Sequence, residues 1–294
     1  MIVRDEQDRL ATCLDSAAPV ADEIVVVDTG STDATVEIAR RYGAIVLQYG
    51  FDPADYARVR NLGLDAARGR YVLVMDADEV LTRRSLGAVR ECLAGGEDGG
   101  WIVTRRNLPA GSRAPAWVDH AVRLFRNRPQ YRFRHRVHET VDDAILASGG
   151  RLQHCSVVLD HHLAEEDRLR QKWQHYVELL REELAAGEAD PSRLVFLMAD
   201  YYKLGMLAQA AVVADRIAET CPEDFTARFQ AALCHLAQGE DLAAARSHLA
   251  AALALRPHDR EALELAAALD GPVPVSAVPP PRREARSAVT PDQL

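Results

Sequence analysis

The sequence predicts an α/β domain with a mostly parallel sheet, followed by an all-α helical region. Two apolar runs that read as fully buried strands, residues 23–28 and 71–76, each end in an aspartate. Helical patterns lie between them, and strands that alternate with helices form parallel sheets. From Glu165 onward the pattern is helical throughout, which indicates a second, separate region.

The composition is that of an ordinary globular protein large enough for two domains. The chain has 294 residues, 48% of them hydrophobic and 27% charged, with a formal net charge of −9. Because nucleic acids and anionic membranes attract basic surfaces, we expect no general binding to either. No signal peptide opens the chain, no apolar run approaches the ~20 residues of a membrane span, and the cysteines form no CxxC pair. These features predict a cytoplasmic protein with free thiols.

Strands and helices alternate along the first part. Met1-Ile2-Val3 resembles the end of a first strand and is so short that we expect an upstream start or a truncated strand. After it we predict strands at 23–28, 44–47 and 71–76, and helices at 34–42 and 55–68. Short strands without intervening helices follow at 101–104, 121–125 and 153–159. They predict an antiparallel extension that completes the site.

The helical region contains an internal repeat. Pro222 and Pro257 lie 35 residues apart, and Gly205 and Gly239 lie 34 apart. Tetratricopeptide units repeat at about 34 residues, so we predict two such repeats within residues 166–270. Their concave surface would hold an acceptor or a partner protein. The proline-rich tail, residues 271–294, is predicted to be disordered.

Two acidic turns follow the buried strands. Asp76-Ala77-Asp78 can direct two carboxylates at one hard cation, Mg²⁺ or Mn²⁺, that also binds substrate phosphates; alternatively, Asp78 caps the next helix. In the turn that begins at Asp28, the carboxylate can accept hydrogen bonds from a base or ribose, and Gly30 lets the backbone approach a ligand. The alternative there is a turn and helix cap without a ligand.

Together these motifs resemble glycosyltransferase family 2 with its GT-A fold. Residues 1–6 are similar to the family's opening strand and turn, 28–33 to its DxGSxD-like motif, 60–61 to its ARN-like motif and 76–78 to its DxD motif. All four occur in the family's order within residues 1–165. The chain is most similar to the bacterial subgroup in which a tetratricopeptide region follows the transferase.

The resemblance implies a nucleotide-sugar site and a metal site. Asp28 would bind the nucleoside, Arg60 the base or diphosphate, and Asp76 the ribose or a metal-bound water. The implied donor-binding residues are Asp5, Glu6, Asp28, Gly30, Ser31, Arg60, Asp76 and Ala77. Asp78 would bind Mn²⁺ or Mg²⁺, which offsets charge on the leaving diphosphate. Six arginines between Arg123 and Arg136 form a local basic run that can supply a diphosphate clamp.

The catalytic base and a further metal ligand are expected later in the chain. An inverting transferase needs a base to deprotonate the acceptor, and residues 135–139 stand where the family's xED-type motif is expected. Glu139 is the candidate, and because no ED pair is present, His138 is the alternative. His161 resembles the family's C-terminal histidine, a metal ligand; His162 is the alternative, since neighbours on a strand face opposite sides.

We therefore predict a metal-dependent, inverting glycosyltransferase. It would move a sugar from a nucleotide-diphosphate sugar, most simply a UDP-sugar, to a saccharide, lipid-linked or peptide acceptor. A nucleotidyltransferase is disfavoured because the turn Arg4–Gln7 contains no glycine. The remaining alternative is a catalytically degenerate transferase that acts as a scaffold through its repeats.

Overall fold

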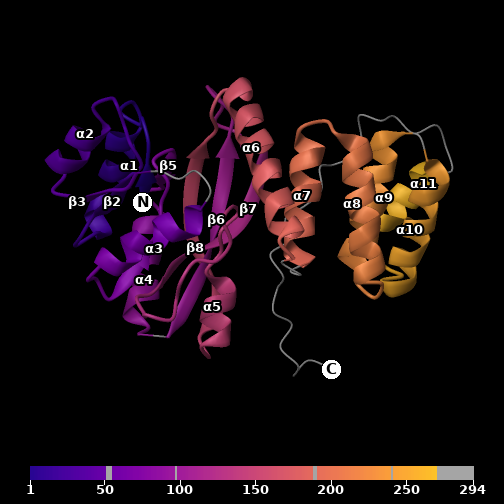
Figure 1. Ribbon diagram of the computed structural model, residues 1–294. Coiled ribbons are helices and arrows are strands. Elements are labelled where there is room, and N and C mark those ends of the chain that lie inside the picture. The colour runs from indigo at the N-terminus through magenta and orange to yellow at the C-terminus, as the bar shows by residue number, and fades with distance from the viewer. Residues whose placement is uncertain (51–54, 97, 188–190, 240, 270–294) are drawn as a thin grey trace. The chain divides into compact units, whose positions relative to one another are not determined.

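The structure is a computed structural model that describes residues 1–50, 55–96, 98–187, 191–239 and 241–269. Within these residues the chain divides into two compact units, one from Met1 to Glu165 and one that begins at Glu166 (Figure 1). The predicted disordered tail, residues 271–294, lies outside the described residues.

A three-stranded parallel sheet opens the first unit. Its strands are β1 (Ile2–Val3), β2 (Val25–Asp28) and β3 (Ile45–Gln48), in the order β1-β2-β3. The helices that accompany it are α1 (Leu10–Ala17), η1 (Ala18–Val20), α2 (Thr35–Arg41) and α3 (Tyr56–Ala66). Val26 and Val27 are both buried, so both faces of β2 are covered, which explains the unbroken apolar run. The parallel sheet predicted from these strands is confirmed.

A five-stranded sheet forms the other half of this unit. It contains β4 (Tyr71–Leu73), β5 (Glu79–Leu81), β6 (Gly99–Leu108), β7 (Trp117–Arg126) and β8 (Arg151–His162), in the order β4-β7-β6-β8-β5. The pairs β4–β7, β6–β7 and β5–β8 are antiparallel, and β6–β8 is parallel. The predicted antiparallel extension is therefore confirmed.

The strand after Gly69 differs from its prediction. We expected a parallel strand over 71–76, but β4 ends at Leu73 and pairs antiparallel with β7. An apolar run reports burial on both faces and carries no information about the direction of the partner strand. The backbone beyond β4 leads through Val74 and Met75, both buried, to Asp76 at the edge of the site.

Helices α4 (Ser85–Ala94) and α5 (Asp142–Ala147) complete the first unit. One hydrophobic cluster joins Cys13 of α1 and Val89 of α4 to Trp101 and Leu159 of the five-stranded sheet. Another joins Phe125 of β7 to Phe133 and to Ile145 of α5. These clusters fix the strand ends from which the candidate site residues project.

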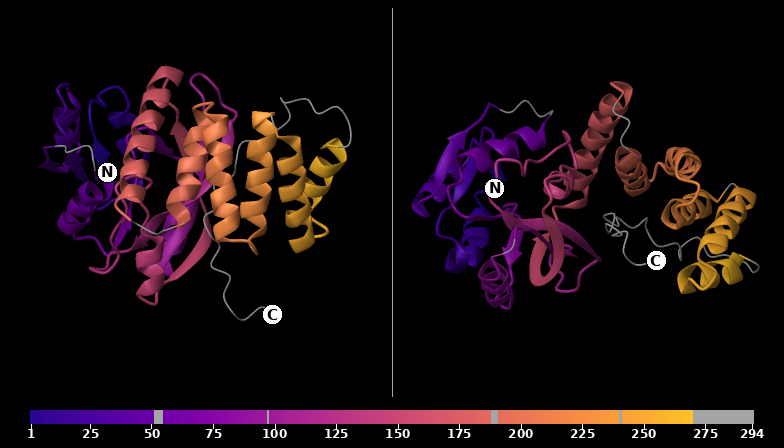
Figure 2. Two further views of the ribbon diagram at one scale, coloured as in Figure 1. Left: turned by 45° about the vertical axis from the view of Figure 1, so that its right-hand side comes forward. Right: turned by 90° about the horizontal axis from the view of Figure 1, so that it is seen from below.

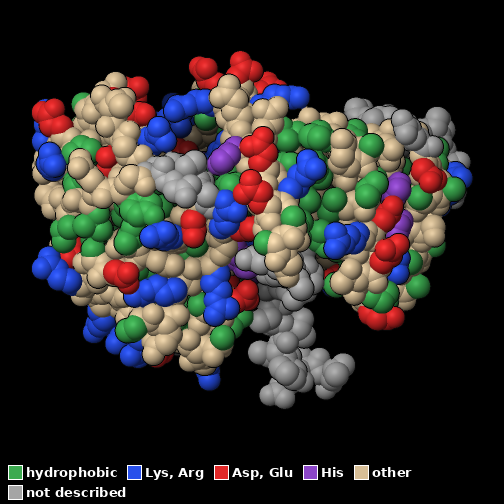
Figure 3. All heavy atoms as spheres, in the orientation of Figure 1, with side chains coloured by type: hydrophobic (Ala, Val, Ile, Leu, Met, Phe, Trp, Pro, Cys, Tyr) green, Lys and Arg blue, Asp and Glu red, His purple; other side chains and the backbone are tan. Residues whose placement is uncertain are grey.

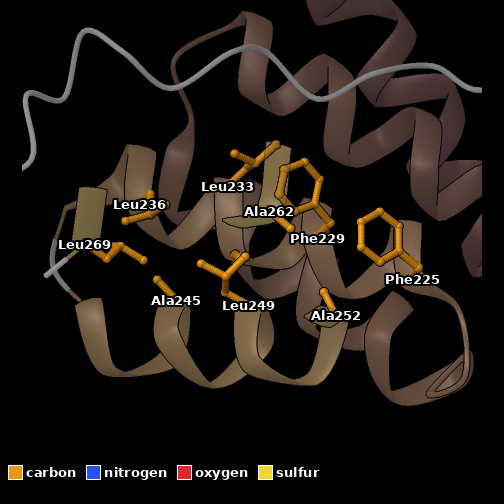
Figure 4. Packing of buried hydrophobic residues seen from close by; sticks show 10 residues of the cluster. Phe225, Phe229, Leu233, Leu236, Ala245, Leu249, Ala252, Ala262 and Leu269 are labelled. Atoms are coloured by element: carbon orange, nitrogen blue, oxygen red, sulfur yellow. The ribbon is translucent and has the colours of Figure 1, made fainter. Parts of the chain in front are cut away.

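The second unit consists of helices among the described residues. They are α6 (Glu166–Ala185), α7 (Pro191–Lys203), α8 (Leu207–Thr220), α9 (Phe225–Gln238), α10 (Leu242–Leu255) and α11 (Arg260–Leu269). Both views of Figure 2 show these helices in a row, each beside the next. In the core, Phe225, Phe229 and Leu233 of α9 gather with Leu249 of α10 (Figure 4). The predicted helical region is confirmed.

The repeat spacing has a local structural cause. Gly205 lies two residues beyond the end of α7 and Gly239 caps α9, with φ of 73° and 76°, in the left-handed region that glycine adopts at low cost. Each is followed by a second helix, α8 or α10. The two helix pairs thus turn at equivalent positions, as a repeat of about 34 residues requires.

Among the described residues, none of the helices combines the length and the apolar character needed to cross a bilayer.

Candidate active site

Hydrogen bonds join the loop after β1 to the loop after β2. The backbone N–H of Asp5 donates to Ser31 Oγ at 3.0 Å, and the N–H of Thr32 donates to Asp5 Oδ1 at 2.7 Å. The N–H of Glu6 donates to Thr35 Oγ1 at 2.7 Å. Asp5 itself has a φ of 52°, a left-handed conformation that its short polar side chain tolerates. The two loops therefore form one ordered edge beyond the carboxyl ends of β1 and β2.

Asp28 ends β2 at this edge. Only 3% of the residue is exposed, and its carboxylate accepts the N–H groups of Ser31 at 3.2 Å and Gly30 at 3.3 Å. Gly30 has a φ of 99°, which side chains rarely permit. The structure thus shows Asp28 in the turn-capping role that the sequence left open, with Gly30 presenting bare backbone beside it.

Asp76 is held between two guanidinium groups. Its Oδ1 accepts Arg60 Nη2 at 2.8 Å and its Oδ2 accepts Arg123 Nη2 at 2.9 Å. Burial alone would raise the pKa of Asp76, but these two charges hold its pKa well below the usual value. The fully buried Glu79 accepts both the backbone N–H of Asp76 at 2.9 Å and Arg123 Nη2 at 3.1 Å. Asp76 is therefore a fixed, ionised acceptor.

Arg60 connects Asp76 to the candidate base. Its Nε donates to Glu139 Oε1 at 2.5 Å, its side chain is only 10% exposed, and its buried Nη1 has no partner among the described residues. The next residue, Asn61, donates to the carbonyl of Phe133 at 2.9 Å and accepts its N–H at 2.8 Å. Residues 60–61 therefore position the segment that carries Glu139. The sequence did not predict this positioning role.

The segment before Glu139 is strained. His135 and His138 have φ of 72° and 50°, and a left-handed non-glycine residue costs on the order of 1–3 kcal/mol. Two backbone hydrogen bonds between Arg134 and Thr140 close the loop, and the fully buried Val137 anchors it. This conformation brings Glu139 into the Asp76 network and leaves His138 half-buried beside it.

Asp78 and His161 face each other across the pairing of β5 with β8. Asp78 Oδ2 lies 3.3 Å from His161 Nε2, and His161 Nδ1 lies 2.7 Å from Asn107 Oδ1. Asn107 donates its amide to Asp119 Oδ2 at 3.1 Å, so its oxygen faces the ring and Nδ1 carries the hydrogen. Nε2 faces the Asp78 carboxylate and is a possible ligand atom in the neutral form of the ring. His162, the alternative ligand, is exposed.

This pair of atoms fits a divalent cation. In the neutral ring, Nε2 and the carboxylate oxygen can bind one cation, because ligand atoms of one ion are roughly 3 Å apart. Arg9 Nη1 also lies 4.0 Å from Asp78 Oδ2. Asn107 also supplies the outer hydrogen bond that metal-binding histidines usually make. Ala77 lies between Asp76 and Asp78 in the sequence, and it is buried. Its small side chain leaves space for the carboxylates of these two aspartates.

Sequence reasoning missed several residues of this site. Asn107, Asp119 and Arg105 come from the β6–β7 hairpin, and Arg105 binds Asp119 through two nitrogens at 2.8 and 3.0 Å. The sequence contains only a weak signal for them, a run of polar residues near the end of an apolar strand. Arg123 was predicted only as a member of the arginine run that can clamp a diphosphate. In the structure it forms ion pairs with Asp76 and Glu79.

Comparison with known proteins identifies the family. Residues 1–160 match the model of glycosyl transferase family 2. The chain belongs to this family. Family 2 is a family of glycosyltransferases, so the first unit is a glycosyltransferase domain with a GT-A-like fold.

Relatives of this family-2 chain include one protein named for its repeats and one named glycosyltransferase. A TPR repeat-containing protein of Synechococcus elongatus is 36% identical over 213 residues, covering 70% of this chain and 51% of that protein. The lipopolysaccharide core biosynthesis glycosyltransferase LpsC of Rhizobium meliloti is 27% identical over 180 residues, covering 57% of this chain and 66% of LpsC. The chain spans about half the length of the Synechococcus relative.

A solved structure shows the same fold at low identity. S. aureus TarS 1–349 in complex with UDP-GlcNAc matches with a TM-score of 0.50 and 16% identity, over 84% of this chain and 88% of that one. At this identity the likeness concerns the fold.

Proposed function

We propose that this family-2 chain catalyses metal-dependent, inverting transfer of a sugar from a UDP-sugar to a saccharide, lipid-linked or peptide acceptor. The observation that carries the proposal is the distance of 3.3 Å between His161 Nε2 and Asp78 Oδ2, with the ring held by Asn107. The TarS structure with a related fold was solved with UDP-GlcNAc, and LpsC is named for lipopolysaccharide core synthesis. The ligand of TarS supports a UDP-sugar as the donor, and the name of LpsC supports a saccharide as the acceptor.

Asp78 and His161 would hold the cation, Mn²⁺ or Mg²⁺. When bound, such an ion neutralises charge on the diphosphate of the donor. Asn107 maintains the tautomer in which Nε2 is the ligand atom. Asp76, fixed by Arg60 and Arg123, would accept a hydrogen bond from a ribose hydroxyl. Because its two salt bridges are already formed, this acceptor needs no rearrangement when the donor binds.

The joined loops after β1 and β2 would receive the nucleoside. Asp28 and Gly30 line this edge, and Asp5, Glu6 and Ser31 keep its shape through the hydrogen bonds described above.

Glu139 would take the proton of the acceptor hydroxyl. As that oxygen forms its bond to the anomeric carbon, the bond to the diphosphate oxygen breaks on the opposite face, which inverts the configuration. Arg60 binds Glu139 through Oε1, so Oε2 is the atom that would accept the proton. The repeats of the second unit would hold the acceptor or a partner protein.

The proposal is tested by a panel of UDP-sugars, assayed for binding and slow hydrolysis with and without Mn²⁺. Hydrolysis of one donor that requires the metal is the expected result and names the sugar. Failure of every UDP-sugar to bind, with or without metal, would overturn the proposal and favour the scaffold alternative.

Replacing Asn107 by alanine is expected to weaken Mn²⁺ about 10- to 100-fold, because outer hydrogen-bond partners of metal-binding histidines contribute about that much. The measurement is the Mn²⁺ concentration at half-maximal donor hydrolysis. Asn127→Ala is the matched control, since the Asn127 side chain donates to the backbone carbonyls of Ala67 and Gly69 and to no residue of the candidate site that the structure describes. An unchanged Mn²⁺ requirement in Asn107→Ala would show that this residue does not orient His161.

A further inference from the structure

Three helices of the second unit direct metal-binding side chains at one point. Asp215 of α8 accepts His235 Nε2 of α9 at 2.8 Å and His248 Nε2 of α10 at 3.0 Å, both at the same oxygen, Oδ1. The two imidazole rings are stacked, with centroids 5.7 Å apart and planes 12° from parallel. In Figure 3 histidine side chains lie beside acidic ones on the surface of this unit.

The polar atoms of both rings meet only at this carboxylate. The Nδ1 atoms of His235 and His248 are buried and have no partner among the described residues. The His235 side chain is 9% exposed and that of His248 is 15% exposed, whereas Asp215 is 39% exposed. Unpaired buried nitrogens are costly in a packed helical unit. The Nε2 atoms of both rings and one carboxylate oxygen therefore converge on a single point between three helices.

We propose that Asp215, His235 and His248 form a site for a divalent transition-metal cation, with zinc as the best match. Two imidazole nitrogens and one carboxylate are a ligand set that zinc accepts, and the nitrogen donors disfavour Mg²⁺ and Ca²⁺. The three ligand atoms lie within 4.8 Å of one another. Ligand atoms in a tetrahedral zinc site are roughly 3.3 Å apart, so shifts of about 1 Å would form it.

The surroundings agree with a site that is reached from solvent. Asp215 is the most exposed ligand and marks the entry side. Three protein ligands leave a fourth position for water or for a group from a partner.

The position of the site between the two helix pairs gives the cation a stabilising role. α8 belongs to the first helix pair, and α9 and α10 form the second. A bound cation would therefore join the two pairs at their junction and stabilise the stack. The proposal does not depend on the transferase activity, because the residues lie in α8–α10 and none of them belongs to the candidate active site.

The test is zinc binding by the full chain that carries Asp78→Asn and His161→Gln, which removes the first candidate metal site. Equilibrium dialysis is expected to show one equivalent of Zn²⁺, and Co²⁺ in its place is expected to give the visible absorption of a four-coordinate ion. Adding Asp215→Asn or His248→Gln is expected to weaken zinc at least about 100-fold, more than the loss of an outer partner. The matched control is His258→Gln, an exposed histidine of the same unit.

Thermal unfolding separates lost binding from lost folding. Zinc is expected to raise the unfolding temperature of the background protein and of His258→Gln, and to leave that of His248→Gln unchanged. Circular dichroism checks that each variant without zinc remains helical. Absence of stoichiometric zinc in the background protein, or equal zinc affinity in Asp215→Asn, His248→Gln and His258→Gln, would overturn the proposal.

Discussion

Asparagine at position 78 is expected to lower metal-dependent donor turnover at least about a thousandfold. Asp78 is the acid whose oxygen lies 3.3 Å from His161 Nε2, and the neutral amide would lose the charge that attracts the cation. A catalytic metal contributes several kcal/mol of charge stabilisation, and about 4 kcal/mol corresponds to roughly a thousandfold in rate. The measurement is kcat for UDP-sugar hydrolysis over a range of Mn²⁺ concentrations.

Two further variants sharpen this experiment. His161→Gln keeps a polar side chain beside Asn107 and is expected to shift the Mn²⁺ requirement upward with a smaller loss of kcat. Asp160→Asn is the matched control on the same strand, because Asp160 pairs with Arg106 through both carboxylate oxygens. It is expected to stay within about threefold of the unchanged protein, because its partner Arg106 is not a residue of the candidate site. Full metal-dependent turnover in Asp78→Asn would refute the metal assignment.

Glutamine at position 139 is expected to reduce kcat about 10²- to 10⁴-fold, the range for loss of a general base. The amide oxygen of glutamine can still accept Arg60 Nε, so the Arg60–Asp76 contact is expected to persist. UDP binding should therefore change little. The measurement is kcat together with the Kd for UDP, because loss of kcat without loss of binding marks a group that acts in the transition state.

His138 is the internal control for this assignment. It adjoins Glu139 and has a φ of 50°. If Glu139 is the base, His138→Gln is expected to stay within about threefold of the unchanged kcat, since it removes no proton acceptor of the reaction. A large loss of kcat in His138→Gln with normal turnover in Glu139→Gln would move the role to His138. A loss of UDP binding in Glu139→Gln would instead make Glu139 a positioning residue.

Much of the fold follows from local sequence patterns. The apolar run before Asp28 predicts a covered strand, and the structure buries Val26 and Val27 there. Gly205 and Gly239, 34 residues apart in the sequence, lie two residues beyond α7 and at the cap of α9, both in the left-handed conformation. The order of acidic motifs also predicted the family to which the chain belongs. These features can be read locally because periodicity, capping and turn chemistry depend on neighbours within a few residues.

The tertiary structure decided the contacts that complete each site. His161 meets Asp78 across 83 residues, and Glu139 meets Arg60 across 79. Asn107 and Asp119 belong to the site because the β6–β7 hairpin places them there. Strand β4 pairs antiparallel with β7. Asp215 lies beside two histidines that come from two other helices. A local pattern shows that a strand is buried and where it ends. Which distant strand or helix lies beside it depends on packing and register over the whole domain, so those partners emerge only when the chain is folded.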